Sequence, residues 1–286
     1  MNYIYVLIHI ALFLQVLSIY ISFQYDLFHA NTCDMSYYYI KHDIISWGPK
    51  HDTYHLYKYY NQFKVKSVEE IHTAPVLFLH GHTGSYQQGR SIFQRLNDHM
   101  DHQSQEYDYY TIDFNEEPSA FSSHILKKQR DYAIKCLEYI LHFYKKDQKL
   151  IIVAHSMGGL IARAIATIKL NSVQAIITLG TPHFQAPIMT DIDMKQFYLQ
   201  LRNYWYPQIE NLPSLISISG GIRDNLVETK LTSISHIGFD KFHIQPYTIR
   251  NIDHSIDHLC LCWCHALVDK IANSIIHFSN FTTITD

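Results

Sequence analysis

Short apolar runs alternate with amphipathic segments along most of the chain, from about residue 74 to the C-terminus. A short apolar run bounded by turn-forming residues is typical of a buried strand, and apolar positions three and four residues apart are typical of a helix. The pattern predicts strands at residues 75–80, 107–114, 150–154, 173–180 and 215–219, and helices at residues 86–100, 121–145, 157–169 and 259–278. This alternation predicts an α/β domain whose mostly parallel sheet is covered by helices on both faces, and such sheets bind ligands at the carboxyl ends of their strands.

One segment, at about residues 184–212, interrupts the alternation and is rich in aromatic side chains. These side chains are Phe197, Tyr198, Tyr204, Trp205 and Tyr206. An insertion of this kind beside an enzyme site can form a lid or the wall of an apolar pocket. The alternative is a surface helix whose aromatic side chains pack on the core, and the sequence leaves both open.

The N-terminal segment is apolar over residues 4–23, where only His9, Gln15 and a few hydroxyl groups interrupt it. A helix of about 20 residues spans about 30 Å, which is the thickness of the hydrocarbon layer of a membrane. We therefore expect an N-terminal transmembrane helix, with residues 1–25 as a membrane anchor and residues 26–286 as the α/β domain.

Two alternatives to a retained anchor stay open. A cleaved signal peptide normally has a basic start and a small-residue cleavage site, whereas this chain has neither Lys nor Arg before the apolar run. A buried core helix is disfavoured by the N-terminal position and the all-round apolarity. Either membrane interpretation puts the α/β domain in a secretory compartment, and the triplet Asn280-Phe281-Thr282 is a glycosylation acceptor that agrees with it.

Length and charge limit the class of function. A chain of 286 residues is long enough for one large α/β domain with a sizeable core. The formal net charge is −3 and there is no basic block, which argues against nucleic acid as a partner. The 20 histidines are scattered along the chain, which argues against a metal site.

The cysteines are few and odd in number: Cys33, Cys136, Cys260, Cys262 and Cys264. At least one of them is therefore free or pairs outside the chain. Cys136 lies on the apolar face of a predicted helix, where we expect a core thiol. Cys33 is a candidate to pair with one of the three C-terminal cysteines.

The strongest chemical signal is the pentapeptide Ala-His-Ser-Met-Gly at residues 154–158, with Gly159 behind it. It follows a predicted strand and precedes a predicted helix, which is the context of the nucleophile elbow of α/β-hydrolases. The turn lifts the hydroxyl of Ser156 off the end of the sheet, and small residues on either side let strand and helix pass closely. The motif predicts an α/β-hydrolase and acyl transfer through a covalent serine ester, although Ala154 stands where Gly is usual.

A serine hydroxyl needs an imidazole to take its proton and a carboxylate to orient that imidazole, in the chain order Ser, Asp or Glu, His. Asp224 is the best acid because it lies just past a predicted strand and behind two glycines. His258, on the loop before the last predicted helix, is the best base. The competing acids are Asp191, Asp193 and Asp240, and the competing base is His254.

Two backbone N–H groups are expected to form the oxyanion hole, those of Met157 and His82. Met157 follows the nucleophile, and His82 lies in the Gly-rich turn after the first core strand. A metal site made of His254, His258 and the nearby cysteines is the alternative for the C-terminal region. The pair of histidines lacks the Glu of a helical zinc motif, so we expect no metal and no organic cofactor.

Several segments together resemble one family, the GPI inositol-deacylases of the endoplasmic reticulum. The matching stretches are residues 33–37, 76–86, 113–117, 154–159, 178–183 and 220–224, Asp257-His258, and Trp263-Cys264. The Gly-Ser-Tyr turn at residues 84–86, the Asp-Phe-Asn-Glu-Glu stretch and the Asp-His…Trp-Cys ending are the most specific of these. The resemblance covers roughly residues 26–272.

The resemblance implies an activity, the removal of the acyl chain from the inositol of GPI anchors, with GPI-anchored proteins or an acylated inositol lipid as the substrate. It implies a catalytic domain on the lumenal side of the endoplasmic reticulum membrane. It also implies Ser156, Asp224 and His258 as the triad. On the matching loops, the residues that we expect to contact the substrate are Gly81, Gly84, Tyr86 and His183.

The chain departs from the family in length and at three positions. Family members usually have Gly in place of Ala154, Pro in place of His80 and Asn in place of His82. They also continue into a further lumenal region and several membrane spans, whereas this sequence ends at Asp286. Two other functions are therefore kept: a lipase or esterase acting on other acylated lipids, and a catalytically silent module that binds GPI anchors.

Overall fold

The computed structural model describes residues 2–28, 33–35, 41–46, 48–60, 75–100, 107–189, 192–238, 242–252 and 255–280. The chain divides into two compact units, Met1–Thr32 and Cys33–Asp286. Each unit is described by itself below.

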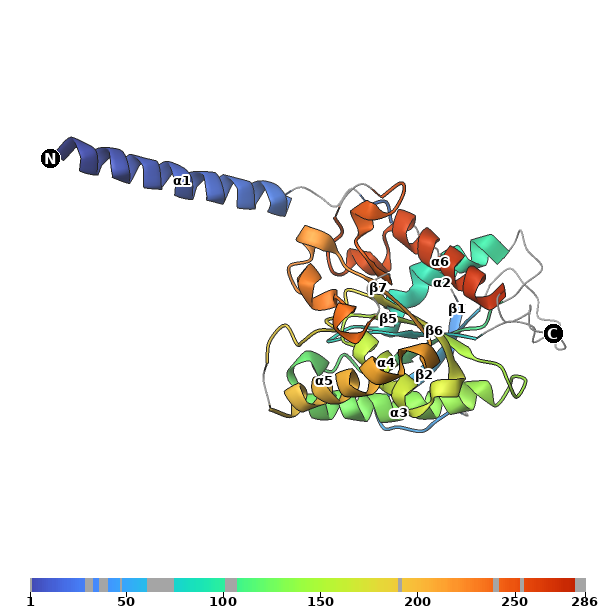
Figure 1. Cartoon of the computed structure of the whole chain (residues 1–286). Coiled ribbons are helices and arrows are strands. Elements are labelled where there is room, and N and C mark those ends of the chain that lie inside the picture. The colour runs from blue at the N-terminus through green and yellow to red at the C-terminus, as the bar shows by residue number, and fades with distance from the viewer. Residues whose placement is uncertain are drawn as a thin grey trace. The chain divides into compact units, whose positions relative to one another are not determined.

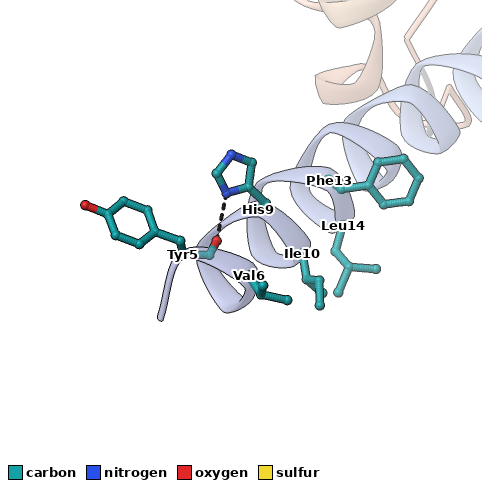
Figure 2. A pocket seen from close by; sticks show the side chains of 6 residues that line it. All are labelled: Tyr5, Val6, His9, Ile10, Phe13 and Leu14. Carbon is teal, nitrogen blue, oxygen red and sulfur yellow. Dashed lines mark hydrogen bonds between the residues drawn. The ribbon is translucent and has the colours of Figure 1, made fainter. Parts of the chain in front are cut away.

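The first unit is one helix, α1 (Asn2–Phe28). Figure 2 shows a shallow hollow on its surface, lined by Tyr5, Val6, His9, Ile10, Phe13 and Leu14, where the ring of His9 donates a hydrogen bond from Nδ1 to the Tyr5 carbonyl at 2.7 Å. Tyrosines, His9 and Gln15 interrupt the apolar side chains of α1. Within the described residues, no helix combines the length and the apolarity needed to cross a membrane, so the transmembrane helix expected at residues 4–23 is not confirmed.

The second unit is built on an eight-stranded sheet with the order β1-β2-β4-β3-β5-β6-β7-β8. Its strands are β1 (Lys41–Ile44), β2 (His55–Tyr60), β3 (Val76–Leu79), β4 (Tyr109–Asp113), β5 (Leu150–His155), β6 (Val173–Leu179), β7 (Ser214–Ile218) and β8 (His243–Ile244). Strands β3 to β8 pair in parallel, while β1 and β2 run antiparallel along one edge. The centre of the sheet is therefore β3-β5-β6, with their carboxyl ends at one edge.

Five helices in the described part of this unit cover the sheet in two layers (Figure 1). They are α2 (Arg90–Met100), α3 (Ser123–Leu141), α4 (Gly158–Ile168), α5 (Ile192–Trp205) and α6 (His265–Asn280). Helices α2 and α6 pack together on one face, and α3, α4 and α5 pack together on the other. The arrangement is the predicted α/β architecture, with helices on both faces of a mostly parallel sheet.

Alternate residues of the central strands feed two hydrophobic cores. In β5, Ile152 and Ala154 face the core under α3, α4 and α5, whereas Ile151 and Val153 face the core under α2 and α6. All six β5 residues are buried, which explains why the strand appears in the sequence as an unbroken apolar run. Two-sided burial makes the position and direction of β5 insensitive to changes in the surface loops.

Most of the predicted elements are present, and three differences have a physical cause. Strands β1, β2 and β8 were not predicted, because β1 and β2 have no uninterrupted apolar run and β8 is two residues long. The last helix begins at His265 rather than at residue 259, because a 3₁₀ turn, Cys260–Cys262, precedes it. That turn is capped by Asp257, whose Oδ1 accepts hydrogen bonds from the Leu259 and Cys260 N–H groups at 3.0 and 2.8 Å.

The aromatic insertion forms α5, and the structure supports the packing alternative. Phe197, Tyr198 and Trp205 are buried in the core beside α4, and Trp205 Nε1 donates to the Arg163 carbonyl at 3.4 Å. Burial of these large rings against α4 is the apolar contribution that holds α5 in place. These three rings are thus part of the core, whereas Tyr204 is partly buried and Tyr206 is exposed.

Within the described residues, one disulfide joins Cys33, at the start of the second unit, to Cys264, directly before α6, with their Cα atoms 5.1 Å apart. The prediction that Cys33 pairs with one of the three C-terminal cysteines is confirmed. Cys136, Cys260 and Cys262 are free thiols and are buried, as was expected for Cys136. Beside the disulfide, a β-bridge joins Met35 to Cys264, and His265 N–H donates to the Asp34 carbonyl at 2.9 Å.

Candidate active site

Ser156 sits on a sharp turn between β5 and α4. Its φ of +54° lies in the left-handed region, which costs a residue with a Cβ about 1–3 kcal/mol. The turn is held from both sides, because Ser156 N–H donates to the Leu179 carbonyl at 2.8 Å and Thr181 Oγ1 donates to the Ser156 carbonyl at 2.8 Å. Both bonds come from the end of β6 and the residues just after it, so this one neighbouring segment maintains the strained backbone.

Close packing explains the small residues around the serine. A Cβ added at Gly158 would lie 2.4 Å from the Leu79 carbonyl oxygen, and one at Gly159 would lie 2.1 Å from Thr181 Oγ1. Both separations are shorter than van der Waals contact, so larger residues would push α4 away from the sheet. Ala154 is fully buried, and its extra methyl group relative to glycine is accommodated in the core on the α4 side.

Asp224 and His258 lie against one another at the same edge of the sheet. His258 Nδ1 donates a hydrogen bond to Asp224 Oδ2 at 2.8 Å, and the other carboxylate oxygen, Oδ1, accepts from the Leu226 and Val227 N–H groups at 3.1 and 2.8 Å. Asp224 is 3 % exposed and His258 is 7 % exposed. Since Nδ1 carries the shared proton, Nε2 is the ring nitrogen left to accept a proton.

Glycines make room for this pair. A Cβ at Gly220 would lie 2.6 Å from the Asp224 Cβ, and a Cβ at Gly180, directly after β6, would lie 3.0 Å from His258 Nδ1 and Cε1. Gly180 has a φ of +59° and follows the strand next to β5. The imidazole of His258 therefore lies over the end of β6, beside the strand that ends at Ser156.

His155 is a buried residue to which the sequence analysis assigned no role. Its Nε2 donates to the His258 carbonyl at 2.8 Å, and the centroids of the two rings are 4.6 Å apart. Burial, reinforced by the nearby His258, lowers the pKa of His155 to about 3, so its ring is neutral at physiological pH. His155 thus ties the His258 backbone to the strand that carries Ser156. The sequence feature that could have singled out His155 is its position directly before Ser156 in the Ala-His-Ser-Met-Gly motif.

The loop after β3 lies directly against the nucleophile turn. A Cβ at Gly81 would lie 2.6 Å from the Ser156 Cβ and 2.7 Å from the Met157 backbone nitrogen. A glycine here leaves the Met157 N–H uncovered by side-chain atoms at residue 81. The structure thus places Gly81, the residue before His82, against Met157, and the assignment of the Met157 and His82 N–H groups to an oxyanion hole stays a prediction.

Two histidines brace this loop against the turn after β4. His80 Nε2 accepts from the Phe114 N–H at 2.9 Å, which leaves its Nδ1 as the donor to the Gly81 carbonyl at 2.9 Å. His82 Nδ1 accepts from the Ala120 N–H at 3.1 Å, and burial lowers the pKa of His82, which keeps the ring neutral as an acceptor requires. The side chains that replace the family's usual Pro and Asn therefore have structural partners.

The remaining predicted substrate contacts are placed differently. A Cβ at Gly84 would lie 3.0 Å from His80 Nδ1, which makes Gly84 part of the braced loop. The Tyr86 ring stacks on Tyr57 with centroids 4.1 Å apart. His183 is 1 % exposed, and its Nε2 shares a hydrogen bond with Thr178 Oγ1 at 2.9 Å. Burial strongly lowers the pKa of His183, and the structure places it beneath the surface that a substrate could reach.

Of the competing residues, Asp193 is the one that the structure describes. Asp193 is an exposed residue in the first turn of α5. Asp191, Asp240 and His254 lie outside the described residues. Within the described part of the chain, the one cluster with metal-ligand character is Cys33, Cys260 and Cys264, two of which form the disulfide.

A serine on a strained strand-to-helix turn, an Asp–His pair at the neighbouring strand ends and a glycine loop over the nucleophile together define an α/β-hydrolase. Solved structures share this fold. An esterase from Rhizomucor miehei aligns with a TM-score of 0.57 at 11 % identity, covering 87 % of each chain. An esterase from the archaeon Pyrobaculum calidifontis aligns with a TM-score of 0.52 at 14 % identity, covering 86 % of each chain.

The family follows from the sequence match. Residues 70–278 match the PGAP1-like alpha/beta domain, and the chain belongs to that family. Two relatives carry the name GPI inositol-deacylase. The one from Coccidioides immitis is 33 % identical, and the match covers 90 % of this chain and 26 % of the relative. The one from Cryptococcus neoformans is 30 % identical, and the match covers 94 % of this chain and 38 % of the relative. The resemblance inferred from the motifs is therefore confirmed, and the chain spans about a quarter to two-fifths of the length of these relatives.

Proposed function

We propose that this chain is a serine hydrolase that removes the acyl chain from the inositol of GPI anchors. The observation that supports it most directly is the hydrogen-bonded pair Asp224–His258 beside the strained turn of Ser156, in a chain of the PGAP1-like family whose relatives are named GPI inositol-deacylase. The substrate is a GPI-anchored protein or an acylated inositol lipid, and the reaction requires no metal or organic cofactor.

In this proposal Ser156 Oγ attacks the ester carbonyl while His258 Nε2 takes its proton. Asp224 keeps the imidazole proton on Nδ1 and stabilises the imidazolium that forms. The N–H groups of Met157 and His82 bind the oxyanion. His258 then returns the proton to the leaving inositol hydroxyl, and water, activated by the same imidazole, hydrolyses the acyl-enzyme.

The surroundings of the pair support an apolar acyl substrate. Three exposed apolar side chains lie within two residues of Asp224 or His258: Ile222 at 87 %, Leu226 at 65 % and Leu259 at 56 % exposure. Exposed apolar groups gathered near a site indicate contact with an apolar ligand or lipid. The Phe121 ring makes a T-shaped contact with the His82 ring, with centroids 4.7 Å apart. In this proposal these apolar side chains contact the acyl chain of the substrate.

We further propose that the enzyme works in the endoplasmic reticulum, with the catalytic unit facing the lumen. The names of its relatives and the family support this location, and the Cys33–Cys264 disulfide is of the kind that forms in an oxidising compartment. The lipid substrate brings the enzyme to the membrane surface.

The test is complementation of cells that lack GPI inositol-deacylase. A bacterial phosphatidylinositol phospholipase C needs a free inositol 2-hydroxyl, so an acyl group there blocks the release of surface GPI proteins. Wild-type chain should restore release, and Ser156→Ala should not, since loss of a triad serine costs about 10⁶ in rate. Because the chain spans only part of its relatives, failure of the well-expressed wild type would refute GPI deacylation by this chain alone.

The second candidate is an esterase for other acylated lipids, and the fold shared with the two esterases of known structure supports it. Labelling of Ser156 by a fluorophosphonate, together with hydrolysis of soluble acyl esters but no rescue in cells, would support it. No labelling of folded protein would instead support a silent module that binds GPI anchors.

A further inference from the structure

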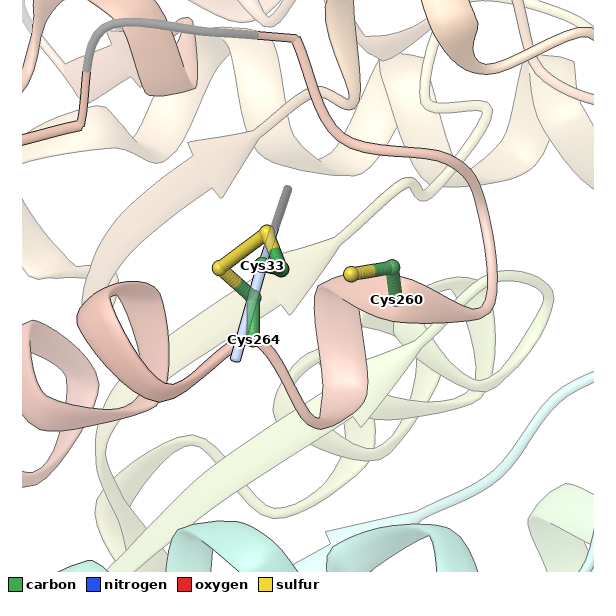
Figure 3. Close-up of side chains that lie close together, drawn as sticks. All are labelled: Cys33, Cys260 and Cys264. Atoms are coloured by element: carbon green, nitrogen blue, oxygen red, sulfur yellow. A yellow bond between two sulfur atoms is a disulfide. The ribbon is translucent and has the colours of Figure 1, made fainter. Parts of the chain in front are cut away.

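Three sulfur atoms lie close together where the start of the second unit meets the turn before α6. The Sγ atoms of Cys33, Cys260 and Cys264 lie within 4.8 Å of one another, although only Cys33 and Cys264 are bonded. Figure 3 shows the sulfur of Cys260 on the side of its residue that faces the disulfide. A free thiol next to a disulfide is the arrangement that thiol–disulfide exchange requires.

The alternative bond is sterically feasible. Cys264 N–H donates to the Cys260 carbonyl at 2.8 Å, so the two residues are one helical turn apart. One turn separates Cα atoms by about 6 Å, which lies inside the range of about 4.4–6.8 Å that a disulfide spans. Little backbone movement is therefore needed to bond Cys260 to Cys264 in place of Cys33.

The three sulfurs differ in exposure, and this sets the direction of exchange. Cys260 and Cys264 are fully buried, whereas Cys33 is partly exposed. Water stabilises a departing thiolate, and a better-stabilised thiolate leaves faster. Attack on Cys264 with departure of Cys33 is therefore favoured over attack on Cys33 with departure of Cys264.

We infer that Cys260 is an internal exchange thiol that converts the Cys33–Cys264 disulfide into a Cys260–Cys264 disulfide. The Cys260 thiolate attacks Cys264 Sγ, the Cys33–Cys264 bond breaks, and Cys33 leaves as a thiolate that takes up the proton lost by Cys260. One disulfide and one thiol are present before and after, so no oxidant or reductant is consumed.

The exchange changes what the disulfide holds. In the first isomer it ties the start of the second unit, at Cys33, to the turn that follows His258. In the second it closes only that turn and leaves the segment at Cys33 joined by the Met35–Cys264 bridge and the Asp34–His265 hydrogen bond.

A trigonal metal site made of the same three sulfurs is the competing use of the cluster. Three thiolates carry three negative charges, and the residues packed around them are apolar, among them Ile256, Leu261 and Leu267. Burial raises the pKa of Cys260, which shows the direction of this penalty for a charged sulfur. The same penalty keeps the thiol protonated at neutral pH, so the exchange is slow from the folded state and the structure holds the first isomer.

The test maps free thiols in the full chain. Protein is incubated at mildly alkaline pH, acidified to stop exchange, unfolded, alkylated and analysed by peptide mass spectrometry. Exchange predicts molecules in which Cys33 is alkylated and Cys260 is not, with the total number of free thiols unchanged. Cys260→Ser should lower Cys33 alkylation at least about tenfold, whereas Cys136→Ser, which also removes a buried free thiol, should not change it.

Two results would overturn the inference. One is that Cys260 stays alkylatable in every wild-type molecule while Cys33 stays blocked. The other is that Cys33 and Cys264 become alkylatable together, which is simple reduction. If Cys260→Ser does not fold, Cys260→Ala provides the same comparison. Zinc or cadmium that binds in proportion to the fully reduced chain would favour the metal site over the exchange. None of these readouts depends on ester hydrolysis, so failure here is distinct from failure of the proposed function.

Discussion

Asp224→Asn is the substitution whose effect the structure predicts in most detail. Oδ1 of Asp224 accepts two backbone N–H groups, from Leu226 and Val227, while Oδ2 accepts the proton on His258 Nδ1. An asparagine has one oxygen and one NH₂ group to fill these places. Turning the NH₂ toward the two N–H groups would leave the buried Val227 donor unpaired, at about 1–3 kcal/mol, and would also break the bond from the partly buried Leu226 N–H.

The amide oxygen of the substituted side chain must therefore face the backbone, and its NH₂ group must face His258. His258 Nδ1 then has to accept, which moves the imidazole proton to Nε2, the atom that should take the proton of Ser156. In another serine hydrolase the same reversal lowers kcat about 10⁴-fold, which corresponds to about 5 kcal/mol of transition-state stabilisation. We expect a loss of that size here, with little change in KM or in fold.

The assay is the second-order rate of fluorophosphonate labelling of Ser156, with hydrolysis of a soluble acyl ester beside it. Asp257→Asn is the matched control, since Asp257 caps the neighbouring turn through the Leu259 and Cys260 N–H groups and asparagine caps equally well. Labelling of Asp224→Asn within tenfold of wild type, with an unchanged urea midpoint, would refute the assignment of Asp224 as the orienting carboxylate.

Three further outcomes follow from the same structure. Gly81→Ala puts a Cβ 2.7 Å from the Met157 nitrogen and should lower kcat about 10²–10³-fold, because it blocks an N–H group of the oxyanion hole. The control Gly48→Ala should leave kcat unchanged, and equal ester hydrolysis rates in the two variants would contradict the prediction. The pKa of His155 is about 3 in the folded chain and 6.5 in the unfolded chain, so the unfolded chain binds a proton first as the pH drops. The free energy of unfolding therefore falls below pH 6.5, by about 1.4 kcal/mol per pH unit. His155→Gln, whose side-chain NH₂ can still donate to the His258 carbonyl, should retain about 2 kcal/mol more stability between pH 6.5 and 5 in urea unfolding, and a variant with the wild-type slope would disprove that cause. Cys33→Ser opens a loop of 231 residues and should cost about 5 kcal/mol in the free energy of unfolding by urea. A loss under about 1 kcal/mol would indicate that the denatured chain is not constrained by this bond.

The sequence was sufficient where one local signal dominates. The buried strand β5 appears as an unbroken apolar run, and the serine between small residues directly after it is visible as a local motif. The family was also recognisable from short stretches such as the loop at Gly81. Strands β1 and β2 were missed because neither carries an uninterrupted apolar run nor a regular alternation of buried and exposed residues.

Other features depend on contacts between residues far apart in the chain. The sequence left Cys260, Cys262 and Cys264 as equal partners for Cys33, and the fold selects Cys264 by a β-bridge at Met35. The sequence left open whether the aromatic segment is a lid or packs on the core, and the fold decides this because α5 packs on α4 and buries Trp205. It could not show that His155 donates to a carbonyl 103 residues away or that His183 lies beneath the surface. Local periodicity reports how far each residue is buried, whereas the partner of a buried polar group depends on which strand ends the topology brings together.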